Sequence, residues 1–336
     1  MNIYEIAKQA NVSIATVSKV INGKQDVGQA TREKVLKIIQ DNNFKPKVSV
    51  TSLKNIAVFA PMGESHPMST PYYSSVLSGI GEVAFDEDYT ITLVSTNRIP
   101  RKEQELLKFC QQRKIDGGIF LLLTMEDSYM AKLAHKLPMV SISRPFDAFP
   151  IGHVEADNLG GGYQAVRHLV EYGHAQILLL LPSQKYHDHQ MRLQGGEQAL
   201  RESGLVKHPG SLNHTMAMSD MDLQLHLERV MGQEPRPTAI FAGMDQEAIR
   251  IMRLLQTIGL RVPEDVSVVG FDDLYFAANT SPPLTTIQHP VYEVGKEACR
   301  TLIRMIEKQE DAAYTDKVLP STKLMIRSST RNIRSQ

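Results

Sequence analysis

Short apolar runs alternate with amphipathic helical patterns along most of this 336-residue chain, between residues 56 and 307. Strands that alternate with helices are typical of parallel sheets with helices on both faces, and runs this apolar are buried on both sides. The pattern therefore predicts an α/β body of doubly wound parallel sheets. The predicted strands are Ile56–Ala60, Ile91–Val94, Gly118–Leu123, Met139–Ile142, Ile177–Leu181, Ala239–Ala242 and Val266–Phe271. The predicted helices lie near Tyr73–Asp86, Lys102–Arg113, Leu159–Tyr172, Gln190–Ser203, Leu223–Met231, Glu247–Ile258 and Val291–Glu307.

Charge is distributed unevenly, although the formal net charge of the chain is zero. Residues 1–54 carry nine basic and four acidic side chains, whereas the remaining residues carry 28 basic and 33 acidic ones. A small basic head on a larger acidic body indicates an anion-binding module joined to a part with another task. An excess of five positive charges also occurs on ordinary solvated surfaces, so charge alone does not decide between the two interpretations.

Three helical patterns fill residues 1–46. The first places Ile3, Ile6, Ala7 and Ala10 on one helical face. Asn11 then tolerates a left-handed turn, and Ser13 is a good N-cap for a second helix, which ends near Asn22. A third pattern starts near Gly28 and stops before Lys45-Pro46. Two helices joined by a three-residue turn predict a helix-turn-helix domain, although a plain three-helix bundle has the same periodicity.

The exposed face of the second helix supplies the candidate DNA contacts. In a helix-turn-helix the start of this helix meets base edges in the major groove. Ile14 and Ala15 can contact a thymine methyl group, and Lys19 can donate to guanine. Hydroxyl groups mainly bond phosphates, which set register but not sequence. The predicted DNA-contacting residues on this helix are Ile14, Ala15, Thr16, Ser18, Lys19 and Asn22.

The string Ile6-Ala7-x-x-Ala10-x-Val12-Ser13-x-x-Thr16-Val17-Ser18-x-Val20-x-Asn22 resembles the N-terminal domain of the LacI/GalR family of bacterial transcription regulators. The match continues through Thr31–Val35 and Phe44-Lys45-Pro46. The resemblance implies a sequence-specific DNA-binding transcription regulator, and we expect it to act as a repressor. The family usually has arginine at the position of Lys19. Arginine can contact guanine with two hydrogen bonds, whereas the lysine ammonium group acts as a point charge.

The connection between head and body departs from the family pattern. The resemblance implies a hinge helix whose leucine wedges into the minor groove, and Leu53 stands at that offset from Pro46. The first strand is expected at about Ile56, so the hinge, residues 47–55, is several residues shorter than usual. The β-branched residues Val48, Val50 and Thr51 modestly disfavour a helix. Two alternatives stay open: a hinge helix with Leu53 on the DNA, and a short extended tether.

Motifs of the same family recur in the body. They are the run Val262–Asp273, the run Ser281–Ile287, Ala156-Asp157-Asn158, and Leu169 with Gly173-His174. They imply a two-lobed body similar to a periplasmic sugar-binding protein, over residues 56–336. The expected lobes are about 56–155 with 285–313, and about 156–284 with 314–336. The resemblance also implies a homodimer, which suits a two-fold operator.

Ligands of open α/β sheets bind beyond the carboxyl ends of the strands. Asp272 directly follows the last predicted strand, and Arg144 follows the strand Met139–Ile142, so both are candidates for a cleft. Arg192 matches the family's effector-binding arginine, and Tyr72 and Tyr73 match its aromatic pair. These five residues are the predicted contacts for a small effector, a sugar or related metabolite. The alternatives are structural: a turn cap at Asp272, a surface ion pair at Arg192, and core packing at the two tyrosines.

Other chemistry finds little support in the sequence. Gly160-Gly161-Gly162 could hold an anion at a helix start, but it lacks a P-loop lysine and the spacing of a dinucleotide fingerprint. His187-Asp188-His189 has metal-ligand residue types without a third ligand placed beside them. No nucleophile elbow occurs. We therefore expect no enzyme, no cofactor and no metal, and a stand-alone solute receptor is disfavoured by the basic head.

The N-terminus and the cysteines indicate the compartment. Met1–Glu5 does not read as a signal peptide, and no apolar run reaches the ~18 residues of a membrane span. These features favour a cytoplasmic protein without membrane contact. Cys110 and Cys299 both lie in helical patterns, so they are expected as buried thiols and not as a disulfide.

Overall fold

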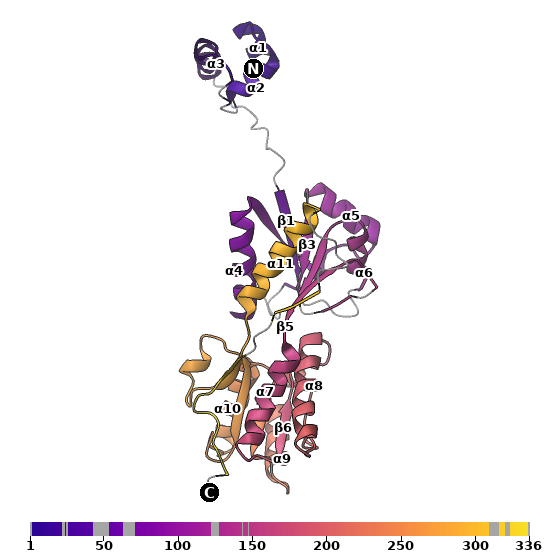
Figure 1. Ribbon diagram of the computed structural model, residues 1–336, viewed down its shortest axis with the longest axis vertical. Helices are drawn as coiled ribbons and strands as arrows, with labels where there is room; N and C mark the ends of the chain where they lie inside the picture. The colour runs from indigo at the N-terminus through magenta and orange to yellow at the C-terminus, as the bar shows by residue number, and fades with distance from the viewer. Residues whose placement is uncertain are drawn as a thin grey trace. The chain divides into compact units, whose positions relative to one another are not determined.

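The computed structural model describes residues 2–21, 24, 26–42, 54–62, 71–121, 128–142, 144–146, 148–308, 316–319 and 323–334. Contacts within the chain divide it into two units, Met1–Leu53 and Lys54–Gln336. The described part of the first unit is helical, and the second unit combines helices with two sheets (Figure 1).

The N-terminal unit contains α1 (Ile3–Ala10), α2 (Ile14–Ile21) and α3 (Gln29–Asp41). Asn11 ends α1 in the left-handed conformation (φ 58°), and Ser13 Oγ accepts a hydrogen bond from the backbone N–H of Thr16 at 3.1 Å. Both features agree with the sequence prediction, and the predicted helix-turn-helix is confirmed. All three helices contribute to one small core, which consists of Ile6, Ala7, Ala10, Val17, Val20 and Val35.

Lobe 1 is a six-stranded parallel sheet with the order β10-β5-β4-β3-β1-β2. Successive side chains of β1 serve opposite faces: Ile56 and Val58 pack under α4 and α11, whereas Ala57 and Phe59 pack under α5 and α6 (Figure 1). A parallel sheet covered on both sides is therefore confirmed. The strands are β1 (Lys54–Ala60), β2 (Tyr89–Ser95), β3 (Gly117–Phe120), β4 (Met139–Ile142), β5 (Gly152–Ala156) and β10 (Asp316–Leu319). The helices are α4 (Pro71–Asp86), α5 (Glu103–Gln112), α6 (Ser128–Ala131) and α11 (Val291–Ile306).

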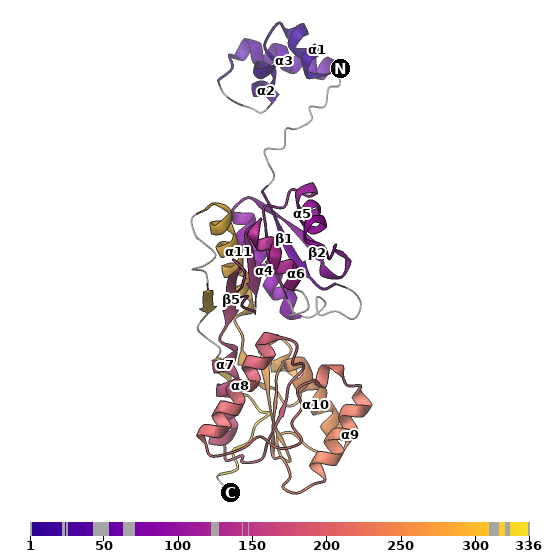
Figure 2. The same cartoon turned by 90° about the vertical axis from the view of Figure 1, so that its right-hand side faces the viewer.

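Lobe 2 is a five-stranded sheet with the order β11-β9-β8-β7-β6, in which only β11 runs antiparallel. Helices α7 and α8 cover one face, and α9 and α10 cover the other (Figure 2). The strands are β6 (Ile177–Leu180), β7 (Ala239–Ala242), β8 (Ser267–Asp272), β9 (Thr285–Gln288) and β11 (Lys323–Met325). The helices are α7 (Asn158–Glu171), α8 (His187–Glu202), α9 (Asp220–Met231) and α10 (Asp245–Thr257).

Two lobe boundaries expected from the sequence are wrong. Strand β9 pairs with β8 in lobe 2, although residues 285–313 were expected in lobe 1. Strand β10 pairs with β5 in lobe 1, although residues 314–336 were expected in lobe 2. The chain therefore passes to lobe 1 after Gln288, and it returns to lobe 2 only after Leu319. Neither strand is a continuous apolar run, so hydrophobicity alone did not reveal them.

Several smaller expectations can be compared directly. Strand β1 starts at Lys54, two residues before the expected Ile56, and residues 47–53 of the hinge, with Leu53, lie outside the described residues. Cys110 and Cys299 are buried free thiols, as predicted. None of the described helices combines the length and the apolar character that crossing a bilayer requires.

Candidate functional site

Helix α2 presents the predicted DNA-contacting side chains on its outer face. Ile14 is 41% exposed, and Ala15 and Lys19 are also exposed. Thr16 and Ser18 are half-buried. Asn22 lies outside the described residues. The face that packs into the core is the opposite one, so the helix offers a short row of small and apolar side chains to an approaching duplex.

Lys19 forms an ion pair with Asp26. Its Nζ lies 2.6 Å from Asp26 Oδ2, with both side chains about half exposed. The hydrogen bond from Lys19 holds the pKa of Asp26 below its usual value. Asp26 therefore competes with any phosphate or base edge for the Lys19 ammonium group, a feature that sequence reasoning missed.

A cavity in the second unit gathers most of the predicted effector-contacting residues. It contains about 580 Å³ of space between its walls, part of which is open solvent. Tyr72 and Tyr73 come from α4 of lobe 1, whereas Arg192 comes from α8 and Asp272 from the end of β8 in lobe 2. Both lobes thus contribute to its wall. The full lining consists of Tyr72, Tyr73, Tyr186, Asp188, His189, Arg192, Met216, Met244, Gln246, Asp272 and Leu274.

Arg144, predicted for the same cleft, is absent from this lining among the described residues. Its guanidinium carbon lies 5.5 Å from the ring centre of Phe146. Together with burial and His153, Arg144 lowers the pKa of His187. A residue that follows a parallel strand lies at the carboxyl edge of the sheet, but this position does not set the direction of its side chain.

Arg192 is 1% exposed and is held by several protein groups. Its Nε donates to Asn158 Oδ1 at 2.9 Å, and one terminal nitrogen donates to the Gly243 carbonyl at 2.7 Å. The other terminal nitrogen lies 3.2 Å from Asp272 Oδ1 and 4.0 Å from Asp188 Oδ2. The guanidinium group is therefore fixed in position, and two carboxylates balance its charge.

Glycine residues allow α8 to carry Arg192 to this point. A Cβ atom on Gly162 of α7 would lie 2.1 Å from the Arg192 carbonyl oxygen, and one on Gly195 would lie 1.9 Å from the Leu159 carbonyl oxygen. Any larger residue would push the two helices apart. The glycine run Gly160–Gly162, weighed above as an anion site, thus includes a position that serves helix packing.

Asp272 ends β8 in an unusual conformation. Its φ of 113° and the φ of 51° at Asp273 are values that side-chain-bearing residues rarely adopt. Burial raises the pKa of Asp272 to about 7, even though Arg192 stabilises the ionised form. Backbone strain and a desolvated carboxylate are features that cluster at functional sites.

The turn after β8 is held by contacts from distant parts of the chain. Arg327 pairs with Asp273 Oδ1 at 2.6 Å and donates to the Leu284 carbonyl at 2.8 Å. Asp245 Oδ2 accepts the backbone N–H of Leu274 at 2.8 Å. Burial raises the pKa of Asp245 to about 8. Sequence reasoning missed these supporting residues, because their partners lie up to 54 positions away.

The aromatic side of the cavity is built around Tyr72. Tyr73 meets it edge-on at 5.0 Å, and His289 stacks on it at 5.7 Å between ring centres. Tyr73 is buried and also belongs to the core of lobe 1, and burial raises its pKa well above the usual value. Tyr73 therefore packs in the core and also lines the cavity, and its contact with an effector stays a prediction.

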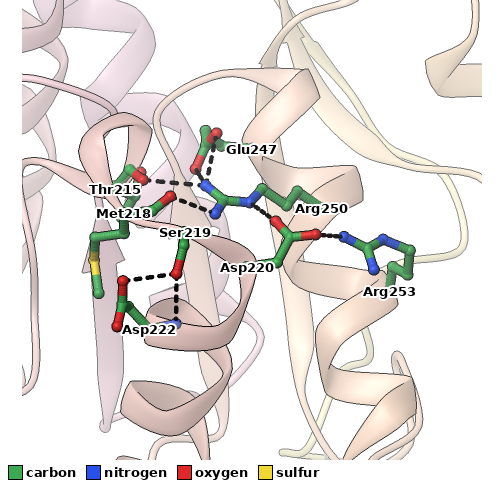
Figure 3. Close-up of polar contacts among 8 residues, drawn as sticks. All are labelled: Thr215, Met218, Ser219, Asp220, Asp222, Glu247, Arg250 and Arg253. Atoms are coloured by element: carbon green, nitrogen blue, oxygen red, sulfur yellow. Dashed lines mark hydrogen bonds and ion pairs between the residues drawn. The ribbon is translucent and has the colours of Figure 1, made fainter.

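The loop that carries Met216 is fastened to α10. Figure 3 shows Arg250 at the centre of this network, where it donates to the carbonyl oxygens of Thr215 at 3.1 Å and Met218 at 2.7 Å. Arg250 also pairs with Asp220 at 2.7 Å and with Glu247 at 3.3 Å. These contacts hold the backbone on both sides of Met216, whereas its thioether side chain is flexible. Met216 and Met244 give the cavity an apolar wall that can adapt to a ligand.

Comparison with known proteins assigns both units. The model for bacterial regulatory proteins of the lacI family matches residues 2–47, and the model for periplasmic binding protein-like domains matches residues 166–330. HTH-type transcriptional regulator DegA of Bacillus subtilis is 30% identical, over 98% of this chain and 97% of that protein. The chain belongs to the LacI family. The Ribose operon repressor of Haemophilus influenzae is 31% identical to this LacI-family chain, over 95% of each.

Solved structures agree with this membership. The lac repressor dimer bound to operator and the anti-inducer ONPF has a TM-score of 0.77 and 26% identity, over 98% of this chain and 99% of that one. The complex of the regulator CelR with cellobiose has a TM-score of 0.71 and 27% identity over the same shares. This LacI-family protein is a transcription regulator and not an enzyme.

Proposed function

We propose that this protein represses transcription by binding operator DNA as a homodimer, and that a sugar or related metabolite in the cavity controls the binding. The observation that carries the proposal is the composition of the cavity wall, to which both lobes contribute. Tyr72 and Tyr73 belong to one lobe, and Arg192 and Asp272 to the other. A ligand that contacts both pairs favours one arrangement of the lobes over the other arrangements.

The operator is contacted mainly by α2. Ile14 and Ala15 make apolar contacts with thymine methyl groups, while Lys19 donates to guanine after release from Asp26. Thr16 and Ser18 bond phosphates. The exposure of Ile14, Ala15 and Lys19 supports this proposal. Asn22 and Leu53, outside the described residues, complete the predicted set, and for Leu53 the minor-groove wedge and the extended tether both stay open.

A homodimer supplies two such heads for the two halves of a palindromic operator. The lac repressor structure named above, a dimer bound to operator, supports this assembly. Regulation then requires that the effector bind one dimer arrangement more tightly than the other, by about 1–3 kcal/mol in typical allosteric proteins. A protein that acts on bacterial chromosomal DNA in this way works in the cytoplasm.

Sugar-like ligands fit the polar groups of the cavity. Arg192 and Asp272 offer hydrogen bonds to hydroxyl groups, and the Tyr72 ring offers an apolar face for stacking. The cellobiose complex of CelR supports a carbohydrate as the class of effector. Asp272→Ala should abolish the effector response while operator binding without effector persists.

The first experiment identifies bound sites across the source genome and then measures retardation of one bound fragment. We expect Lys19→Ala and Asn22→Ala to lose specific retardation. Lys37→Ala on α3 removes the same charge as Lys19→Ala and serves as a control that should keep specific retardation. Equal retardation by wild type and both variants refutes the α2 assignment. DNA-bending assays with Leu53→Ala distinguish the two alternatives for the hinge. Reduced DNA bending supports the wedge, and unchanged DNA bending supports the tether.

A further inference from the structure

Charge in the cavity restricts the effector beyond its general class. Among the described residues that line it, Arg192 is the one cationic side chain, and Asp188 and Asp272 both face it. Burial acts to raise the pKa of Asp188, but Arg192 and the backbone N–H of His189, which donates to Asp188 Oδ1, outweigh it and hold the pKa below its usual value. Burial lowers the pKa of His189, so this ring is neutral near pH 7. The cavity therefore has no surplus positive charge.

The donors of Arg192 are also largely engaged. Its Nε donates to Asn158, and one terminal nitrogen donates to the Gly243 carbonyl. The other terminal nitrogen faces the carboxylates of Asp188 and Asp272. A phosphate group usually requires a free guanidinium or ammonium group, or a cluster of backbone N–H groups. A phosphate beside Arg192 would instead approach Asp188 and Asp272 with the same sign of charge.

The body segments outside the described residues add no basic side chain to this balance. The body segments 63–70, 122–127, 143, 147, 309–315 and 320–322 contain neither lysine nor arginine. They hold six acidic residues, among them Glu64, Glu126 and Asp147. Whatever part of these segments lies near the cavity, none supplies a cation for an anionic ligand.

We propose that the effector is an uncharged ring compound with several hydroxyl or N–H donors, and that its phosphorylated or carboxylated forms are excluded from the cavity. This inference rests on the proposed function. The donors satisfy the oxygens of Asp188 and Asp272, and the ring packs between Tyr72 and the methionine wall. Phosphoryl transfer onto the effector is then the class of reaction that ends its binding.

The test uses the full-length protein and matched pairs of compounds: ribose and ribose 5-phosphate, glucose and glucose 6-phosphate, adenosine and its monophosphate. Calorimetry and thermal shift are measured at constant ionic strength. We expect the uncharged member of any binding pair to bind at least tenfold more tightly. A phosphorylated member that binds equally or better overturns the inference and leaves the proposed function standing. If no compound of any pair binds, the proposed effector class fails, and this inference fails with it.

A variant tests the electrostatic cause. Asp188→Asn removes one of the two carboxylates that balance Arg192, so we expect the preference against the phosphorylated member to fall by about tenfold. Asp86→Asn, an exposed change at the end of α4, gives the same change in net charge and should leave the preference unaltered. Equal preferences in wild type and Asp188→Asn contradict the charge argument.

Discussion

Asparagine at position 272 would keep the shape of the Asp272 side chain but cannot ionise. Burial raises the pKa of Asp272 from 3.8 to about 7, although Arg192 lies 3.2 Å away. One pKa unit corresponds to about 1.4 kcal/mol, so ionising Asp272 costs about 4 kcal/mol more in the folded protein than in the unfolded chain. We therefore predict that Asp272→Asn raises the free energy of unfolding of the unliganded protein by about 4 kcal/mol at pH 8.

The dependence of this gain on pH has a definite sign. Because the folded-state pKa is raised, the folded protein binds the Asp272 proton more tightly than the unfolded chain does between the two pKa values. The stability contributed by this proton is fully present below pH ~4 and is lost as the pH rises through ~7. The gain from asparagine is thus under about 2 kcal/mol at pH 5 and reaches its full size above pH ~7.

Urea unfolding followed by far-ultraviolet circular dichroism at pH 5 and pH 8 measures both values. Asp86→Asn, with the same change in net charge on the surface, should show no such gain at either pH. Asp245 is another buried carboxyl group, and after burial the Asp272 charge is the next cause of its raised pKa. Loss of that charge therefore adds a gain of the same sign at pH 8. A gain that is equal at the two pH values, or a loss of stability at pH 8, would refute the reasoning about the buried carboxylate.

Three further predictions concern supporting contacts. Arg327→Ala leaves the partly buried Asp273 carboxylate without its ion pair, so the free energy of unfolding should fall by about 3 kcal/mol and effector affinity by more than tenfold. Unchanged affinity in calorimetry would show that this ion pair does not support the site. Arg250→Ala should cost a similar ~3 kcal/mol, because Glu247 is nearly buried, and chemical denaturation would detect it. Asp26→Asn frees the Lys19 ammonium group and adds one net positive charge to the head, so operator binding should strengthen and its salt dependence should steepen. An unchanged salt slope in fluorescence anisotropy would contradict this.

Most of the fold could be predicted because the central strands are nearly pure apolar runs. Strands β4 and β7 begin and end at the predicted residues. Strand β5 contains His153 and Glu155, and β9 contains Thr285 and Gln288, so neither has the composition of a buried strand. Pairing with neighbouring strands decides their structure, and hydropathy does not record such pairing. Because hydropathy does not record strand pairing, β9 was not recognised, and the lobe boundary near Thr285 was placed wrongly.

The candidate site was predictable in part for a similar reason. Asp272 follows a recognisable strand, so its position at the sheet edge could be predicted, and Arg192 and the tyrosine pair came from the family resemblance. Asp188 and Met216 carry no such local signal. Their role as wall residues depends on how α8 and the loop before α9 pack in lobe 2. Contacts of this kind arise only in the folded chain.

The raised pKa of Asp272 has a consequence for effector binding itself. Near pH 7 the carboxyl group is about half protonated, and hydroxyl donors of a ligand stabilise the ionised form. Binding should therefore release up to about half a proton per site at pH 7. Calorimetric titrations in phosphate and Tris buffers measure this release, because the two buffers differ in their enthalpy of ionisation. Asp272→Asn should remove the dependence on buffer if it still binds, and identical binding enthalpies of the wild type in both buffers would show that the ligand does not change the ionisation of Asp272.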